Sequence, residues 1–159
     1  MNTFAALAAI GLIFSPLMAA AQELAVVGLD GRVVTVTAKE FDDLPRTTVD
    51  AGTAPAVVHY QGAVLTSVLR LVGAPAGPTL HGKPVKDYVV VTGADGFAAV
   101  LSLAETDAAL HKGAVIIADS AAGAPLADHE GPYRLVIEGD LKSFRSVRHV
   151  VRIELKAAP

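Results

Sequence analysis

Short aliphatic runs separated by turns that contain glycine or proline determine the fold class of this chain more than any other feature. Val, Ala and Leu dominate these runs, and a core of small aliphatic side chains suits pleated sheets. Two pairs of runs flank Asp-Gly turns and are expected to form β-hairpins: residues 24–28 with 33–37, and residues 87–92 with 97–101.

Helical segments are few and short. Residues 64–72 place apolar side chains at helical spacing and are followed by Gly73, a residue type that commonly ends helices. Ser102 and Glu105 have the spacing of a capping box, in which each side chain bonds the backbone N–H of the other residue. This box predicts a short helix that runs to about His111.

The rest of the chain alternates between strands and loops. We expect further strands at residues 47–49, 56–60, 114–118, 134–138 and 147–155, a short helix or turn at 39–44, and loops at 74–86 and 121–132. No internal repeat or linker divides the sequence. The predicted fold class is α+β, a mixed and mostly-β domain of roughly eight or nine strands with two short helices.

The first 21 residues have the pattern of a secretory signal peptide. An apolar run from Phe4 ends in three alanines, the last of which is Ala21, just before the first charged side chain at Glu23. We therefore expect cleavage after Ala21, a single domain over residues 22–159, and a periplasmic or secreted protein without a membrane span. The alternative is a retained membrane anchor, which needs about 20 apolar residues.

Composition disfavours several classes of function. The formal net charge is −3 and the few aromatic residues are not interleaved with basic ones, so the chain is not typical of nucleic-acid binders. The five histidines lack the short spacings of zinc ligands. The sequence also lacks a Gly-x-Ser-x-Gly elbow and a glycine-rich phosphate loop. Nothing in it identifies an autonomous catalytic centre.

Charge is distributed unevenly along the chain. Acidic side chains outnumber basic ones up to Tyr133, whereas basic ones dominate from Arg134 onward. The basic residues of this C-terminal part are Arg134, Lys142, Arg145, Arg148, Arg152 and Lys156. A basic segment on an acidic body indicates an anion site. The alternative is a solvated edge strand protected by its charges.

Four phrases of the sequence occur in an order that belongs to a known domain. They are Tyr60-Gln61-Gly62-Ala63-Val64-Leu65 with the helix that follows, Ala94-Asp95-Gly96-Phe97 continuing to Glu105, Gly123-Ala124-Pro125-Leu126, and the stretch from His129 to Asp140 continuing through residues 147–153. In this order they resemble the sulfite oxidase-type oxidoreductase molybdopterin-binding domain family. The chain is similar to the compact secreted branch of that family.

The resemblance implies a fold, a cofactor and a set of contacts. His129 and Arg134 keep the family's spacing of five, with Pro132 between them, and the matching family side chains contact the pterin and its phosphate. The loop that follows resembles the family's glycine-containing loop, and its Arg148 matches the family's basic residue. The expected cofactor-binding residues are His129, Arg134, Lys142, Ser143, Arg145 and Arg148.

Two departures from the family concern the cofactor directly. The sequence contains no cysteine, whereas the family holds molybdenum through a cysteine thiolate, and the corresponding region offers Asp50, Thr53 and His59. Glu130 stands directly after the histidine, where the family usually has glycine, and the glycine is displaced to Gly131. The resemblance implies molybdopterin as cofactor, but the missing sulfur argues against molybdenum.

The predicted site residues also have structural interpretations. Arg134 can pair with Glu130 or Asp128, and Arg145 and Arg148 can project into solvent from a strand or bulge. Under these interpretations the C-terminal charges stabilise the fold or its solubility and hold no ligand.

Three functions follow, and the sequence leaves them open, including whether the protein is an enzyme. The leading one is an exported, non-catalytic binding or accessory module, with a pocket for an anionic small molecule or pterin phosphate between the His129–Arg134 junction and the loop 142–148. The second is a molybdopterin-dependent oxidoreductase that holds its cofactor without a cysteine. The third is a protein-interaction domain with a closed ancestral pocket and a periplasmic protein partner.

Overall fold

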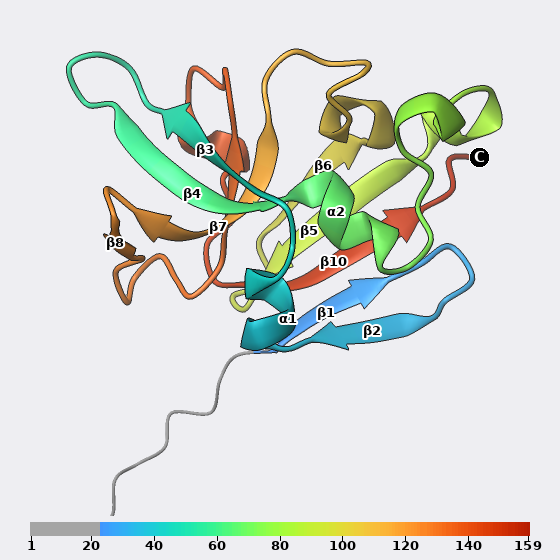
Figure 1. Cartoon of the computed structure of the whole chain (residues 1–159), viewed down its shortest axis with the longest axis horizontal. Helices are drawn as coiled ribbons and strands as arrows, with labels where there is room; N and C mark the ends of the chain where they lie inside the picture. The colour runs from blue at the N-terminus through green and yellow to red at the C-terminus, as the bar shows by residue number, and fades with distance from the viewer. Residues whose placement is uncertain (1–22) are drawn as a thin grey trace, which may run out of the picture.

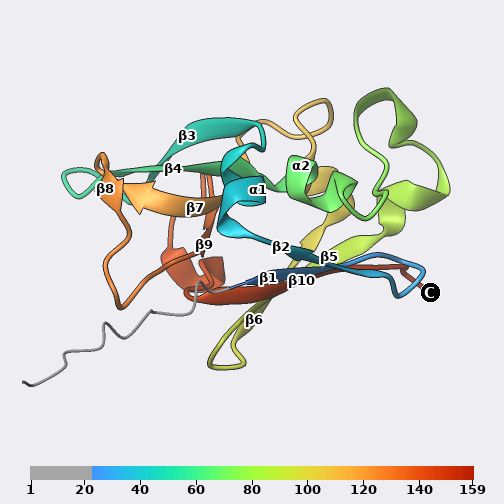
Figure 2. The ribbon, with the colours of Figure 1, turned by 60° about the horizontal axis from the view of Figure 1, so that its bottom comes forward.

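Two five-stranded sheets build the molecule and lie in two layers (Figures 1 and 2). The computed structural model describes residues 23–159, so the signal peptide expected over residues 1–21 lies outside the described residues. Among the described residues, none of the helices has the length and apolar character needed to cross a membrane.

Sheet A has the strand order β2-β1-β10-β5-β6. Its strands are β1 (Leu24–Val27), β2 (Val33–Val36), β5 (Tyr88–Gly93), β6 (Ala98–Ser102) and β10 (Val150–Lys156). The β1–β2 and β5–β6 pairs are antiparallel and confirm the two predicted hairpins. The C-terminal strand β10 lies between the two hairpins, parallel to β1 and antiparallel to β5, and so joins them into one sheet.

Sheet B is organised around its central strand. Its strands are β3 (Arg46–Ala51), β4 (Val58–Val64), β7 (Val115–Ala121), β8 (Ala124–Pro125) and β9 (Arg134–Ile137). All four pairings are antiparallel: β3 with β4, and β7 with β4, β8 and β9. The N-terminal half of β7 pairs with β9 and its C-terminal end pairs with β8. Strand β9, which carries part of the predicted site, is therefore fixed at an edge of this sheet.

Two short α-helices, α1 (Ala38–Asp42) and α2 (Leu65–Arg70), lie on the same side of sheet A as sheet B does (Figure 2). Helix α1 begins at Thr37, whose hydroxyl accepts a bond from the Glu40 amide while the Glu40 carboxylate accepts one from the Thr37 amide. Four single-turn 3-10 helices complete the elements: η1 (Gly77–Thr79), η2 (Lys83–Lys86), η3 (Leu103–Thr106) and η4 (Ser143–Arg145). The two α-helices and the mostly-β architecture agree with the predicted fold class.

The main core fills the space between the sheets. Val26, Val91 and Ile153 reach it from sheet A, and Ile117 and Leu135 reach it from sheet B, all without exposed surface. Burial of such side chains stabilises a fold by about 1.5–3 kcal/mol each before the entropic cost of ordering them. This core therefore supports both sheets without any disulfide.

A second, smaller cluster lies on the opposite face of sheet B. Its buried members are Val49, Tyr60, Ile116, Ala118 and Val136. Side chains alternate along a strand, so β9 sends Leu135 and Ile137 to the main core and Arg134 and Val136 to this second face. The alternation places Arg134 beside a small apolar cluster on the outer side of the sheet.

The helix expected from Ser102 to about His111 is wrong in length. The capping box is present, with the Glu105 amide donating to Ser102 Oγ at 3.1 Å, but only the single turn η3 follows. Asp107 is buried and its Oδ1 accepts from the Ala109 amide at 2.8 Å, which diverts a donor that a continuing helix would use. The side chain thus competes with the helical backbone.

Two other segments differ from the expectation. The loop predicted over residues 121–132 contains β8, a two-residue strand, so residues 23–159 form ten strands. The strand expected from residue 147 begins at Val150, because His149 adopts a left-handed conformation with φ 47° and interrupts extended pairing.

Candidate functional site

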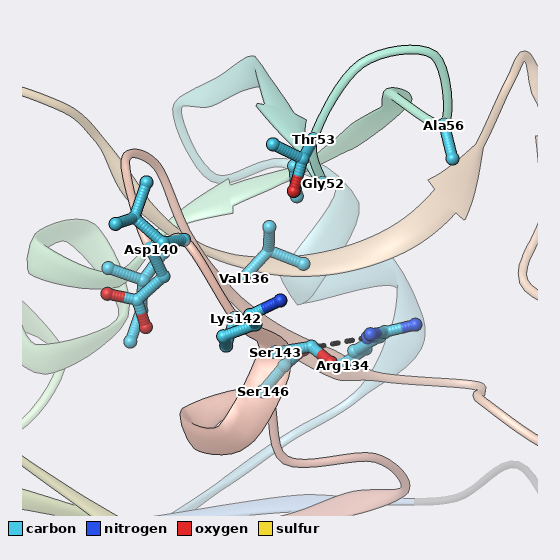
Figure 3. A pocket seen from close by; sticks show the side chains of 12 residues that line it. Gly52, Thr53, Ala56, Arg134, Val136, Asp140, Lys142, Ser143 and Ser146 are labelled. Carbon is cyan, nitrogen blue, oxygen red and sulfur yellow. Dashed lines mark hydrogen bonds between the residues drawn. The ribbon is translucent and has the colours of Figure 1, made fainter.

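A pocket of about 310 Å³ opens on the outer side of sheet B (Figure 3). It lies between the β3–β4 loop and the segment that runs from β9 to η4. The lining residues are Ala51, Gly52, Thr53, Ala56, Arg134, Val136, Ile137, Asp140, Leu141, Lys142, Ser143 and Ser146. Strand β9 provides the floor, and the two loops form opposing walls.

The β3–β4 loop owes its shape to one glycine. Gly52 has a φ of +108°, and a Cβ built on it would meet the Ala56 carbonyl oxygen at 2.3 Å. The Ala56 amide in turn donates to the Thr53 carbonyl at 2.9 Å, which closes a tight turn. A larger residue at position 52 would push this wall away, so the glycine positions Thr53 over the pocket.

Arg134 lies on the floor, but its guanidinium is already engaged. Nε donates to Ser146 Oγ at 2.8 Å, and Nη1 donates to the Tyr60 hydroxyl at 2.9 Å. Nη1 also donates to the carboxylate of Glu130, with which Arg134 forms an ion pair. The guanidinium carbon lies 5.0 Å from the centre of the Tyr60 ring, within cation–π range. The prediction that Arg134 can pair with Glu130 is confirmed.

Glu130 is held by backbone contacts on both sides. Its amide donates to the Ala127 carbonyl at 2.8 Å, and its own carbonyl accepts from His149 at 3.1 Å. The next residue, Gly131, packs so tightly that an added Cβ would meet the Leu126 Cβ at 2.9 Å. The backbone therefore fixes Glu130 beneath the arginine whether or not the two charges attract.

Both walls of the pocket carry donors that remain available. The side chains of Lys142, Ser143 and Thr53 form no hydrogen bond or ion pair with any other residue in the described range 23–159. In Figure 3 the lysine ammonium points into the space between Thr53 and Arg134. One ammonium and two hydroxyl groups thus face the same cavity.

Arg145 lies behind the wall that carries Lys142 and does not line the pocket. Its Nη2 and Nε donate to the two carboxylate oxygens of Asp140 at 2.8 and 3.2 Å, and its Nη1 donates to Glu105 at 3.1 Å. The hydrogen bond to Asp140 and that to Glu105 raise the pKa of Arg145 further above its ordinary value. Burial alone would raise the pKa of Glu105, but hydrogen bonds from the Ser102 amide and from Arg145 lower it.

The six residues predicted from the sequence therefore separate into two groups. Arg134, Lys142 and Ser143 line the pocket. His129 and Arg148 are exposed outside it, and Arg145 is bound to Asp140. Ser146 was not among the predicted residues. Thr53 was predicted only as a residue in the region where the family has its cysteine, and the structure places it on a pocket wall. Gly52 and Pro55 were the signs of a turn between β3 and β4.

The donor set does not fit a molybdenum centre held by protein sulfur. The chain has no cysteine, and within residues 23–159 no group of three His, Cys, Asp or Glu side chains gathers as metal ligands do. Of the residues in the region where the resemblance places the thiolate, Asp50 and His59 are exposed and pair with each other, with Nδ1 and Oδ1 2.5 Å apart. The guanidinium that would meet a cofactor phosphate is bound to Glu130.

A family profile places the chain among known proteins. The profile described as "Oxidoreductase molybdopterin binding domain" matches residues 15–159, which is most of the sequence. The chain belongs to this family. The resemblance noted in the sequence is thereby confirmed. The family usually binds molybdopterin, and this member lacks the cysteine.

Solved structures agree on the fold. The sulfane dehydrogenase SoxCD from Paracoccus pantotrophus superposes with a TM-score of 0.61 at 20% sequence identity, over 86% of this chain and 39% of the SoxCD chain. At this identity the match concerns the fold alone. The molybdopterin-domain chain spans about two-fifths of that protein. No functionally curated protein matches the sequence.

Proposed function

We propose that this molybdopterin-domain protein is an exported, non-catalytic binding module that takes a small anionic ligand in the pocket. The observation that carries the proposal is the position of Lys142, Ser143 and Thr53, which face one cavity with unpaired donors. The signal-peptide pattern of the first 21 residues supports export. The missing cysteine argues against molybdenum chemistry.

The balance of charge supports an anion. Two of the three charged lining residues are neutralised within the fold, because Arg134 pairs with Glu130 and Asp140 pairs with Arg145. The ammonium of Lys142 is then the one lining charge without a partner among the described residues. Phosphate or carboxylate oxygens suit an ammonium flanked by hydroxyl groups.

The size and lining restrict the ligand further. A cavity of about 310 Å³ is at the small end of the range of about 300–1,000 Å³ for small-molecule sites. Val136, Ile137 and Leu141 add an apolar surface beside the polar donors. The pocket suits a compact ligand with one anionic end and an apolar body, and a pterin phosphate is one such compound.

The lining of the pocket favours binding over acid–base catalysis. Among the described residues no histidine lines it, and its single carboxylate, on Asp140, accepts two bonds from Arg145. A general base must reach the substrate proton, and these bonds hold the carboxylate toward Arg145, which does not line the pocket. We therefore assign binding and no chemical step to these residues.

Ligand titration tests this proposal. Thermal unfolding and calorimetry of the mature protein are followed as inorganic phosphate or a pterin phosphate is added, because binding to the native state raises the unfolding temperature. We expect stabilisation that Lys142→Ala removes. Lys112→Ala is the matched control, since Lys112 is an exposed lysine that lines a different cavity. Equal behaviour of the two variants, or no stabilisation of the wild type, contradicts the proposal.

Metal and pterin analysis of protein purified from its native compartment tests the oxidoreductase alternative. Molybdenum near one atom per chain would overturn the proposal and favour an enzyme that holds its cofactor through pterin contacts. Protein free of both metal and pterin agrees with the binding module.

One observation favours a second function, the docking of a protein segment. Leu141 and Phe144 have 79% and 81% of their surface exposed and flank the unpaired Lys142. Charge complementarity then selects a segment with an acidic residue between apolar ones. Synthetic peptides of this pattern should bind the wild type and lose binding to Phe144→Ser, and unchanged binding to that variant would exclude this function.

A further inference from the structure

The guanidinium of Arg134 borders the pocket, but two of its three nitrogens are bound within the fold. Its side chain is only 8% exposed, and Ser146, Tyr60 and Glu130 accept bonds from Nε and Nη1, while Nη2 has no partner among the described residues. A planar guanidinium is the side chain best suited to carboxylate and phosphate oxygens. The pocket thus has an anion receptor on its floor that already holds an anion.

The anion on this receptor comes from the chain itself. Glu130 is 16% exposed and lies in the turn before β9, four residues ahead of the arginine. The pair between Lys39 and Asp43 has the same spacing, but its side chains are 84% and 67% exposed and remain in water. A pair that is largely desolvated separates far less readily than a solvated one, because each charge would be left buried alone.

The arginine is positioned independently of this carboxylate. Ser146 Oγ receives the bond from Nε and itself donates to the Leu135 carbonyl at 2.6 Å, so the hydroxyl is anchored to β9. Tyr60 holds Nη1 from β4. Neutralising Glu130 would therefore leave the guanidinium oriented, with donors directed toward an incoming oxyanion.

We propose that Glu130 is a built-in counter-anion that occupies the oxyanion position at Arg134. Nη1 of the wild-type arginine is then closed to an external anion, which binds on the side of Lys142, Ser143 and Thr53. Removal of the Glu130 charge opens a second anion position on the floor. The ligand class for that position is a phosphate- or sulfate-type oxyanion. The inference concerns Arg134 and Glu130 and holds whether or not the proposed function at Lys142 is correct.

The test compares phosphate binding of the wild type with that of Glu130→Gln, which keeps the shape of the side chain and loses its charge. Calorimetry near neutral pH should show a Kd for inorganic phosphate lower by about tenfold or more, as expected for new charge-assisted hydrogen bonds. The double variant Glu130→Gln with Arg134→Lys should lose this gain, because lysine lacks the fork. Glu138→Gln is the control, since it removes the same charge from an exposed carboxylate next to a different cavity.

A measurement on the wild type does not depend on how the variant folds. In isotope-labelled protein the Nε–H resonance of Arg134 should stay unchanged as phosphate is added. A shift of that resonance in the wild type, or a folded Glu130→Gln protein with no tighter phosphate binding than Glu138→Gln, overturns the inference. Loss of wild-type binding in Lys142→Ala reports on the proposed function separately, since Lys142 lies on the opposite wall.

Discussion

The two sides of the pocket have opposite electrostatic states. On the closed side, a buried guanidinium binds one carboxylate and two hydroxyl groups of the protein through Nε and Nη1. This side consists of Arg134, Glu130, Tyr60 and Ser146. On the open side, which consists of Lys142, Ser143 and Thr53, the donors have no partner among the described residues. Both sides carry a positive charge. Whether a positive side chain is available to a ligand therefore depends on the groups that surround it, and the charge alone does not predict this.

The closed side should carry the largest effect on stability. Arg134→Ala leaves the carboxylate of Glu130 buried without its partner, and breaking a buried ion pair costs about 3–5 kcal/mol. We expect a loss of this size in the free energy of unfolding, measured by urea denaturation. Lys39→Ala, which breaks the solvated pair with Asp43, should change the same quantity by less than about 1 kcal/mol. Similar losses in both variants would mean that the Arg134 pair is solvated as well.

The second-largest effect on stability is expected in the β3–β4 loop, which forms one wall of the pocket. Gly52→Ala forces a side chain into a conformation with φ +108° and against the Ala56 carbonyl oxygen, a strain of about 1–3 kcal/mol. We expect lower stability together with weaker anion binding, since Thr53 moves with the loop. Gly31→Ala is the control, because Gly31 also has a positive φ of +79° but nothing within 4 Å of the added Cβ. If both variants bind phosphate equally well, the β3–β4 loop is not part of the site.

The dependence of stability on acid pH should report on the hydrogen bonds that Glu105 forms with Ser102 and Arg145 behind the open side. The pKa of Glu105 is lowered in the folded state from an ordinary value of 4.5, although burial opposes this, because Ser102 and Arg145 bond its charged form. A group with a lowered folded pKa contributes stability above its unfolded pKa and loses it as the pH falls through the folded value. The stability from Glu105 is therefore complete above about pH 4.5 and lost in more acidic solution.

Glu105→Gln should reduce the loss of stability that occurs as the pH falls. The side chains of Glu105 and Arg145 are 32% and 39% exposed, so the difference should stay below about 1 kcal/mol. The measurement is the unfolding temperature of both proteins on either side of pH 4.5. Parallel curves for the two proteins would show that Arg145 does not stabilise the charged form of Glu105.

The sequence predicted the fold better than the site, for a physical reason. Hairpins and α2 follow from local patterns such as Asp-Gly turns and apolar spacing at residues 64–72, and the structure contains them. The length of the helix after Ser102 was overestimated because Asp107 bonds the Ala109 amide and, in addition, the amide of Gly77. The second contact joins residues distant in sequence, and no local pattern predicts it. The pocket depends on such distant contacts throughout, since the β3–β4 loop meets residues 140–146 only after sheet B has formed.

The charge pattern of the sequence also does not distinguish the predicted cofactor-binding residues from one another. Arg134, Arg145 and Arg148 are equivalent as positive residues in the basic C-terminal segment. In the structure one is buried with Glu130, one is bound to Asp140 and one is exposed outside the pocket. The sequence offered Glu130 or Asp128 as the partner of Arg134, and the structure shows Glu130.

The smallest effect on stability is expected on the open side, where it is the most informative. Lys142→Ala removes an exposed side chain that pairs with no described residue, so the free energy of unfolding should change by no more than about 0.5 kcal/mol. Phosphate-induced stabilisation should nevertheless disappear, since the variant loses the one unpaired positive charge of the lining. The proposal therefore expects Lys142 to contribute to binding and not to folding, and Arg134 to contribute to folding. If Lys142→Ala lowers stability as much as Arg134→Ala does, the open side has a structural role and the contrast between the two sides disappears.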